Sequence, residues 1–300
     1  MSKGAIGIIG LGNIGRGVAA SYLDKSSFDV FVWDVQEPAR AHFVGQERVT
    51  VAPPGEMAKQ ANAILFIVPA TPQIEECFDG PDGILAAQPE SLVVFDLTTS
   101  DPNASRALAS RVGEAGITYF DSGTSGGPYK AEKGELLFMV GGDETSFNAN
   151  RKYIEPIAEH LFYVGPSGAG HTLKLLHNIV CHATTLATAE AGHMAEMSGI
   201  PLGTMIDVFN ASNARSYSTE FRFPKHIVSQ TWDGRSRIFN LHKDIQMGAD
   251  MGKALGADIS FTNATLGILR RAMACGKSED DYTTLYRDFD KIRATEPETT

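Results

Sequence analysis

The stretch Ala5–Asp34, with the sequence AIGIIGLGNIGRGVAASYLDKSSFDVFVWD, decides the fold of this chain. It opens with an apolar run, 5–9, passes through a glycine turn and a helix-like segment, and closes with a second apolar run before the acidic residue. Strand, tight glycine turn, helix, strand and acid in this order are typical of a dinucleotide-binding unit. The turn itself is Gly10-Leu11-Gly12-Asn13-Ile14-Gly15.

Each part of this stretch has its own physical role. Gly10 permits the sharp turn, Gly12 lets the backbone approach a pyrophosphate, and Gly15 lets the helix pack closely on the strand. The helix N-terminus offers free N–H groups to the phosphates. Asp34 can accept hydrogen bonds from the adenosine ribose hydroxyls but would repel a 2′-phosphate, and no Lys or Arg follows until Arg40. A glycine turn can also join strand and helix without a ligand, but the flanking strands and the acid favour binding of NAD rather than NADP.

The composition is that of an ordinary soluble globular protein, and 300 residues suggest two domains. The net charge of −10 and the scattered basic residues exclude the basic stripe of a nucleic-acid binder. The three cysteines are far apart and show neither a disulfide framework nor metal-ligand spacing, which indicates a reducing, cytoplasmic compartment. No run of eighteen apolar residues is present, so we expect no membrane span.

Short apolar runs alternate with helical segments through the first half of the chain, as in a mainly parallel sheet covered on both faces. After the first two strands, the expected strands are 63–68, 91–96, 117–121 and 136–140. Beyond the glycine-rich stretch 164–170 a long helical pattern runs to about Ser198, and further helical patterns cover 202–210, 244–255 and 262–273. The sequence therefore predicts a Rossmann-type doubly wound α/β domain, 1–165, followed by an all-α domain, 166–300.

Two sets of polar residues are candidates for chemistry. Lys174 and Asn178 stand four residues apart early in the long helix, so they project from one face, where the lysine could exchange a proton with a substrate oxygen. Ser125, Gly126 and Gly127 follow a strand and could present a hydroxyl and backbone N–H groups to a carboxylate. The alternatives are a surface lysine and a flexible turn at the strand end.

These blocks together resemble the β-hydroxyacid dehydrogenase family. The resemblance rests on four stretches in the family's order: 7–15 with Asp34, 121–136, 165–178, and Lys243-Asp244-Ile245. It implies an NAD-dependent oxidoreductase that interconverts a small β-hydroxy acid and its aldehyde or keto acid. It also implies a helical domain that mediates self-association into a homodimer or homotetramer.

The resemblance assigns roles residue by residue. Lys174 would be the general acid/base, Asn178 would orient the reacting oxygen or the substrate carboxylate, and 125–127 would hold that carboxylate. The positions that match residues lining the cofactor are Val68, Pro69, Gln73, Thr99 and, beside the nicotinamide, Lys243.

Departures from the family pattern concern the substrate rather than the reaction. Thr124 stands where valine is common, and Asn213-Ala214 before Arg215 replaces Ser-Gly, which favours a polar C3–C4 acid. An imine reductase on the same scaffold is one alternative, but such members generally lack the lysine at position 174. A non-catalytic NAD-binding interaction module is another, and NAD binding without turnover would favour it. The Glu-x-x-His spacing at Glu190 is not expected to bind a metal, because carboxylate-bridged sites usually need a second such motif.

Overall fold

The computed structural model describes residues 4–296 and divides into two compact units. The first, the sheet unit, extends to Lys174, and the second, the helical unit, begins at Leu175. The division falls inside the long helix rather than at the predicted boundary after residue 165. None of the helices in the described part of the chain combines the length and hydropathy that a bilayer crossing requires.

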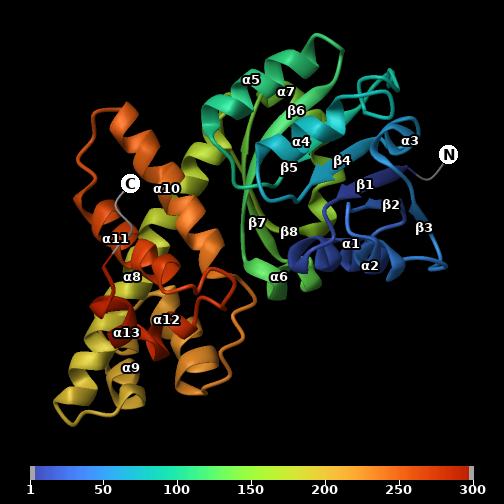
Figure 1. Cartoon of the computed structure of the whole chain (residues 1–300). Helices are drawn as coiled ribbons and strands as arrows, with labels where there is room; N and C mark the ends of the chain where they lie inside the picture. Colours follow the sequence, from blue (N-terminus) through green and yellow to red (C-terminus); the bar gives the residue numbers. More distant parts are fainter. Residues whose placement is uncertain (1–3, 297–300) are drawn as a thin grey trace. The chain divides into compact units, whose positions relative to one another are not determined.

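The sheet unit is built on one eight-stranded sheet with the order β3-β2-β1-β4-β5-β6-β7-β8 (Figure 1). Neighbouring strands are parallel except for β6 and β7, which pair antiparallel. This confirms the predicted mainly parallel sheet. The strands are β1 (Ala5–Ile9), β2 (Asp29–Trp33), β3 (Val49–Val51), β4 (Ala63–Phe66), β5 (Val93–Asp96), β6 (Thr118–Ser125), β7 (Leu136–Gly141) and β8 (Ala158–Gly165).

Helices cover both faces of this sheet (Figure 1). Alternate strand residues point to opposite faces, so Leu65 joins one buried apolar cluster and Ile64 and Phe66 join the other. The first cluster includes residues of α1, α6 and α7, and the second includes residues of α3, α4 and α5. The helices are α1 (Asn13–Lys25), α2 (Glu37–Ala41), α3 (Pro54–Ala58), α4 (Thr71–Phe78), α5 (Pro102–Gly113), α6 (Gly127–Lys133) and α7 (Glu144–Asn150), with short 3-10 turns at Arg151–Tyr153 and Glu155–Ile157.

Two strands lie outside the set that the sequence predicts. β3 and β8 are the edge strands of the sheet. β3 has only three residues, and none of the eight residues of β8 is fully buried. Edge strands need not bury both faces, so they lack the continuous apolar run that marks the central strands.

The helical unit contains two apolar clusters, one centred on α10 and α11 and the other on α9 and the segment 218–228. Its elements are α8 (Ala169–Met197, which begins in the sheet unit), α9 (Leu202–Asn210), the π-helix η3 (Ser218–Val228), α10 (Ile238–Ala254), α11 (Ser260–Ala274), α12 (Thr284–Arg287) and α13 (Phe289–Ala294). The predicted helices 202–210, 244–255 and 262–273 correspond to α9, α10 and α11. The all-helical character predicted for this region is confirmed.

Candidate active site

The glycine turn after β1 has the geometry that its sequence predicts. Gly10 has φ +97°, a conformation that side chains rarely adopt, and a Cβ atom there would lie 2.1 Å from the carbonyl oxygen of Ile67. A Cβ atom on Gly15 would lie 1.9 Å from the carbonyl oxygen of Gly10. At Gly12, by contrast, an added Cβ would meet nothing within 4 Å. Gly10 and Gly15 are therefore required by the fold, whereas the space beside Gly12 is open for a ligand.

The start of α1 is suited to a pyrophosphate. Its N-cap residue is Gly12, which offers no side chain to the first-turn N–H groups. Such N–H groups and the helix dipole attract phosphate. Asn13 and Ile14 form the first turn, and Leu11 before them is fully buried. The residues present therefore fit the diphosphate of NAD.

Asp34 lies directly beside this turn. Its carboxylate accepts hydrogen bonds from the backbone N–H of Leu11 at 2.7 Å and of Gln36 at 2.8 Å. Arg40 donates to the backbone carbonyl of Asp34 at 2.6 Å, and its guanidinium lies 4.6 Å from the ring centroid of Trp33. Asp34 is thus held at the end of β2, where a ribose would lie, with Arg40 as the neighbouring cation.

The loops after β4 and β5 carry the other predicted cofactor positions. Val68 donates its backbone N–H to the hydroxyl of Thr98 at 3.3 Å, so the loops that contain Pro69 and Thr99 are joined. Gln73 lies in the first turn of α4. Its Oε1 is buried and has no hydrogen-bond partner among residues 4–296. An orphaned amide oxygen at this position fits a cofactor that supplies hydroxyl or amide donors.

The structure brings Lys174 close to the strand that leads into the serine-glycine loop. A Cβ atom on Gly123 would lie 2.6 Å from the Cβ of Lys174, so only glycine permits this approach. Gly123 and Ser125 stand two residues apart on β6, and their side-chain directions therefore share one face of the strand. Gly126 and Gly127 follow with φ values of +127° and +65°. Lys174 thus lies on the same side of β6 as the Ser125 side chain.

A buried polar network, made of Asp121, His171, Ser105 and Asp96, fixes the start of α8. The carboxylate of Asp121 accepts from the backbone N–H of Gly168 at 2.7 Å and of His171 at 3.0 Å. The His171 ring contacts the Ser105 hydroxyl through Nδ1 at 2.7 Å and the Asp96 carbonyl through Nε2 at 3.1 Å. All four side chains are fully buried. The network holds the helical turn that precedes Lys174 against β5, β6 and α5.

Asp96 is the titratable group most affected by this environment. Its carboxylate accepts from the hydroxyl of Tyr119 at 2.6 Å and from the backbone N–H of Thr98 at 2.9 Å. Complete burial raises the pKa of Asp96, although His171 and these hydrogen bonds act in the opposite direction. Burial and the neighbouring Asp96 also raise the pKa of Tyr119 well above its usual value.

In the helical unit, Asn178 and the block 243–245 are brought together. The Asn178 side-chain amide donates to Asp244 Oδ2 at 2.7 Å, and its oxygen lies 3.0 Å from His177 Nδ1. Lys243 Nζ lies 3.3 Å from Asp244 Oδ1. Asn178 is only 5% exposed and follows Lys174 by one turn of α8. Asp244 therefore sets the orientation of the Asn178 amide.

Sequence reasoning did not assign functional roles to Asp121, His171 or Asp244. Each lies within a stretch that carries the family resemblance. Their closeness in sequence to Ser125, Lys174 and Lys243 is the one feature that could have identified them as candidates. Among the substrate-bordering candidates, Thr124 donates its hydroxyl to the carbonyl of Ser122 at 3.0 Å, and Arg215 is exposed and lies 3.6 Å from Glu220.

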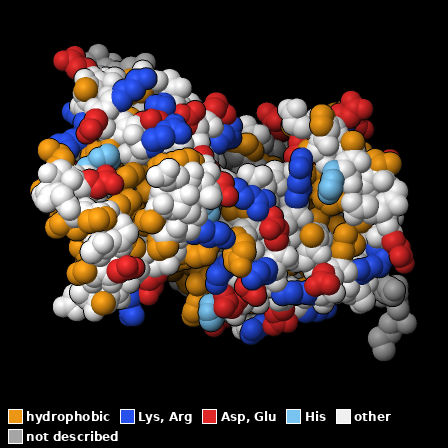
Figure 2. Space-filling model, turned by 90° about the horizontal axis from the view of Figure 1, so that it is seen from below, with side chains coloured by type: hydrophobic (Ala, Val, Ile, Leu, Met, Phe, Trp, Pro, Cys, Tyr) orange, Lys and Arg blue, Asp and Glu red, His pale blue; other side chains and the backbone are white. Residues whose placement is uncertain are grey.

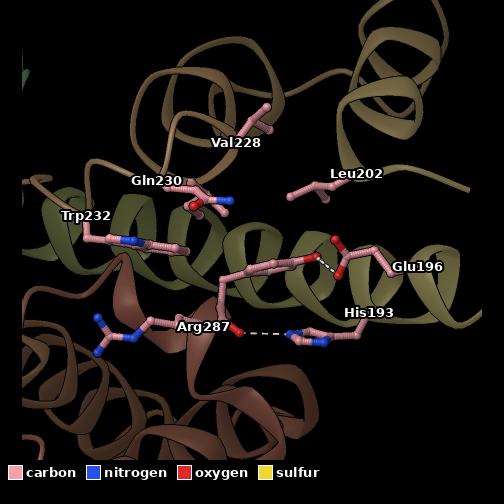
Figure 3. A pocket seen from close by; sticks show the side chains of 9 residues that line it. His193, Glu196, Leu202, Val228, Gln230, Trp232 and Arg287 are labelled. Carbon is pink, nitrogen blue, oxygen red and sulfur yellow. Dashed lines mark hydrogen bonds between the residues drawn. The ribbon is translucent and has the colours of Figure 1, made fainter.

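A separate concavity of about 300 Å³ lies entirely within the helical unit (Figure 3). Among its lining residues, His193 contacts the backbone carbonyl of Tyr286 at 2.8 Å, and the Tyr286 hydroxyl donates to Glu196 at 2.7 Å. These contacts join the end of α8 to α12. They give His193, the histidine of the Glu-x-x-His spacing, a structural role. Across residues 4–296, no group of three or more His, Cys, Asp or Glu side chains is arranged to hold a metal ion.

Comparisons with known proteins cover nearly the whole chain. A family model described as the NAD binding domain of 6-phosphogluconate dehydrogenase matches residues 5–165. A second, described as the NAD-binding of NADP-dependent 3-hydroxyisobutyrate dehydrogenase, matches residues 168–289. The first model alone spans more than half of the chain.

Individual relatives agree with these matches. A probable mitochondrial 3-hydroxyisobutyrate dehydrogenase of Dictyostelium discoideum is 28% identical over 96% of this chain and 91% of its own length. The 2-(hydroxymethyl)glutarate dehydrogenase of Eubacterium barkeri is 28% identical over 96% of this chain and 95% of its own. The crystal structure of a 3-hydroxyisobutyrate dehydrogenase from Salmonella typhimurium superposes with a TM-score of 0.83 at 25% identity, covering 95% of this chain and 99% of that one. The chain belongs to the β-hydroxyacid dehydrogenase family of NAD-binding oxidoreductases, and the relatives named here are dehydrogenases of hydroxy acids.

Proposed function

We propose that the protein interconverts a small β-hydroxy acid and its aldehyde or keto acid, with Lys174 as the general acid/base. The observation that carries this proposal is the close approach of Lys174 to Gly123 of β6. Lys174 lies on the face of β6 to which the Ser125 side chain points. A lysine in this position can take the hydroxyl proton during oxidation and return it during reduction. Lys174 is 9% exposed, so bulk water has little access to it.

NAD, when bound, accepts the hydride from the substrate carbon. The residues that would hold it are Gly12 and the first turn of α1 for the diphosphate, Asp34 for the adenosine ribose, and Gln73 for a polar group of the cofactor. A carboxylate held at the end of β2 would repel a 2′-phosphate, which favours NAD over NADP. Arg40, beside it, is the residue that would have to accommodate such a phosphate.

The substrate carboxylate is assigned to Ser125, Gly126 and Gly127. Their hydroxyl and backbone N–H groups are donors, and the positive φ angles of both glycines aim the peptide groups in directions closed to other residues. Asn178 would hold the reacting oxygen, with its amide orientation set by Asp244. Holding the substrate carboxylate at a fixed place near Lys174 would lower the entropic part of the barrier.

The test is NADH formation across a panel of small β-hydroxy acids, repeated with NADP. The panel includes 3-hydroxyisobutyrate, L-threonate, D-glycerate, serine, 3-hydroxypropionate and 2-(hydroxymethyl)glutarate, the last because a relative is named for it. We expect turnover with NAD and a preference for polar acids over 3-hydroxyisobutyrate. NAD binding without turnover of any acid, in either direction, would contradict the proposal and favour a non-catalytic module.

We further propose that the protein self-associates through α8. Four exposed apolar residues of α8 fall on the a and d positions of one heptad repeat, as in the seam between two packed helices. They are Leu173, Leu176, Val180 and Met194. Val180 is 67% and Met194 61% exposed, which is unusual for an apolar stripe without a partner. Figure 2 shows hydrophobic side chains gathered on the surface of the helical unit.

A second copy is the expected occupant, because the same heptad stripe on two antiparallel helices is complementary to itself. Light scattering after size exclusion should give a dimer or tetramer for the wild type and a smaller species for Val180→Glu. Asp207→Asn, an exposed change on α9, is the matched control. A monomeric wild type at micromolar concentration would refute self-association through this face.

A further inference from the structure

Arg222 on η3 is a partly buried cation without an acidic partner. Its guanidinium lies 5.4 Å from the ring centroid of Tyr217 and 5.3 Å from that of Tyr282. Among residues 4–296 it donates to Thr185 Oγ1 at 2.7 Å and forms a side-chain hydrogen bond with Cys181, and it forms no ion pair with a carboxylate in that range. Burial opposes its charge, but Cys181, Tyr282 and Tyr217 act in the other direction, and the pKa of Arg222 is raised.

The surrounding hydroxyl groups cannot satisfy the remaining donors. Thr185 already donates to the carbonyl of Cys181 at 2.8 Å and shares a hydrogen bond with Ser218 at 2.7 Å. An arginine side chain carries five N–H donors in a planar fork, so most of those of Arg222 have no protein acceptor in the described chain. A guanidinium partly withdrawn from water and held between aromatic rings is suited to bind a carboxylate with two parallel hydrogen bonds.

The backbone that carries Arg222 is itself unusual. Ser218–Val228 forms a π-helix of 11 residues with Pro224 inside it. π-helical geometry is rare, and it is frequently found at functional sites. The widened helix therefore gives a second, independent reason to assign a function to this segment.

Arg222 contacts the face of α8 that carries the catalytic candidates. Asn178, Cys181 and Thr185 stand at positions i, i+3 and i+7, and therefore lie along one side of the helix. With about 1.5 Å of rise per residue, Cys181 is about 4.5 Å and Thr185 about 10 Å beyond Asn178 along the axis. Lys174 is one turn before Asn178 on the same side. A side chain of about two or three carbon atoms on a substrate bound at Asn178 would pass beside Cys181, with which the arginine is hydrogen-bonded.

We infer that Arg222 binds a second carboxylate of the substrate, so that the preferred substrates are β-hydroxy acids with an additional acidic arm. This inference rests on the proposed dehydrogenase function and names its substrate class. Oxidation at the hydroxyl carbon would be unchanged, with bound NAD supplying the hydride acceptor and Lys174 taking the proton, while Arg222 holds the distal carboxylate.

The experiment compares 2-(hydroxymethyl)glutarate with its distal monoamide, which has the same shape but lacks the second charge. The wild type should show a kcat/KM for the diacid about 10- to 100-fold above that for the amide, as expected for one charge-assisted bidentate contact. Arg222→Gln should reduce this ratio to near one, mainly through KM. Arg222→Lys, which keeps the charge but not the fork, should give an intermediate ratio, and Arg287→Gln, an exposed arginine of the same unit, should keep the wild-type ratio.

The outcomes separate the two proposals. If the wild type oxidises no hydroxy acid, the proposed function fails. If it oxidises 3-hydroxyisobutyrate but shows no preference for the diacid over the amide, or if Arg222→Gln leaves that preference intact, only this inference is overturned. If Arg222→Gln does not fold, the diacid-to-amide ratio of kcat/KM in the wild type and in Arg222→Lys still tests the inference. Thermal melting and NAD binding verify the fold of each variant.

Discussion

The two units present their candidate functional groups in different ways. In the sheet unit these groups come from consecutive residues in turns at strand ends, 10–15 and 125–127, where glycine conformation determines what the backbone can bind. In the helical unit they are single side chains from separate elements: Asn178 on α8, Asp244 on α10 and Arg222 on η3. Binding by backbone leaves a local sequence pattern, whereas binding by scattered side chains does not.

The units also differ in how they satisfy buried polar groups. In the sheet unit, Asp121 and His171 are fully buried and hydrogen-bonded, and they fix the helical turn that precedes Lys174. In the helical unit, Arg222 contacts Thr185, Cys181 and two tyrosine rings, and no carboxylate among residues 4–296 pairs with it. The first arrangement is that of a rigid support, and the second is the one to which we assign a ligand.

The largest expected effect tests whether the sheet unit supplies the proton-transfer group. Lys174→Ala should lower kcat by about 10²- to 10⁴-fold, the usual contribution of a positioned acid/base, while NAD affinity stays within about twofold. Single-turnover kinetics and NAD titration measure the two quantities. Lys253→Ala, an exposed lysine on α10, is the matched control. Unchanged kcat in Lys174→Ala would remove Lys174 from the mechanism.

A second prediction separates structural from binding glycines in the same turn. Gly15→Ala should destabilise the protein by about 1–3 kcal/mol, because its Cβ would overlap the Gly10 carbonyl. Gly12→Ala should leave Tm nearly unchanged, since its φ of −67° suits alanine and no atom lies within 4 Å, but should raise the Kd for NAD about 10-fold or more. Thermal melting and calorimetry report these separately. Equal effects of both substitutions on Tm would contradict the division of roles.

The smallest expected effect concerns pH and the buried network. The raised pKa of Asp96 means that the folded state binds its proton more tightly than the unfolded state. The resulting stabilisation is complete below the ordinary aspartate pKa of about 3.9 and is lost as pH rises through the folded-state value. The side chain of the Asp96→Asn variant cannot titrate. The Tm of the variant minus that of the wild type should therefore become more positive between pH 4 and pH 8. If this difference in Tm becomes more negative over the same range, the folded state favours the ionised form of Asp96, and the prediction is wrong.

Much of the candidate site was readable from the chain because its parts are local. The glycine turn with Asp34, the pair Lys174 and Asn178, and the loop 125–127 each lie within one strand–turn–helix junction or one helix. Central strands were equally clear, since burial on both faces demands continuous apolar runs. The edge strands β3 and β8 were not, because half-exposed strands need no such run.

The sequence by itself determined the order of elements, the nucleotide-binding turn and the residue types available for proton transfer. Only the tertiary structure decided that Gly123 admits Lys174 beside β6, that Asp244 orients Asn178, and that Arg222 reaches α8 without an acidic partner. The physical reason is range: backbone conformation and helical periodicity act over a few residues. Contacts between residues 37 to 66 positions apart depend on how helices pack, which no local pattern encodes.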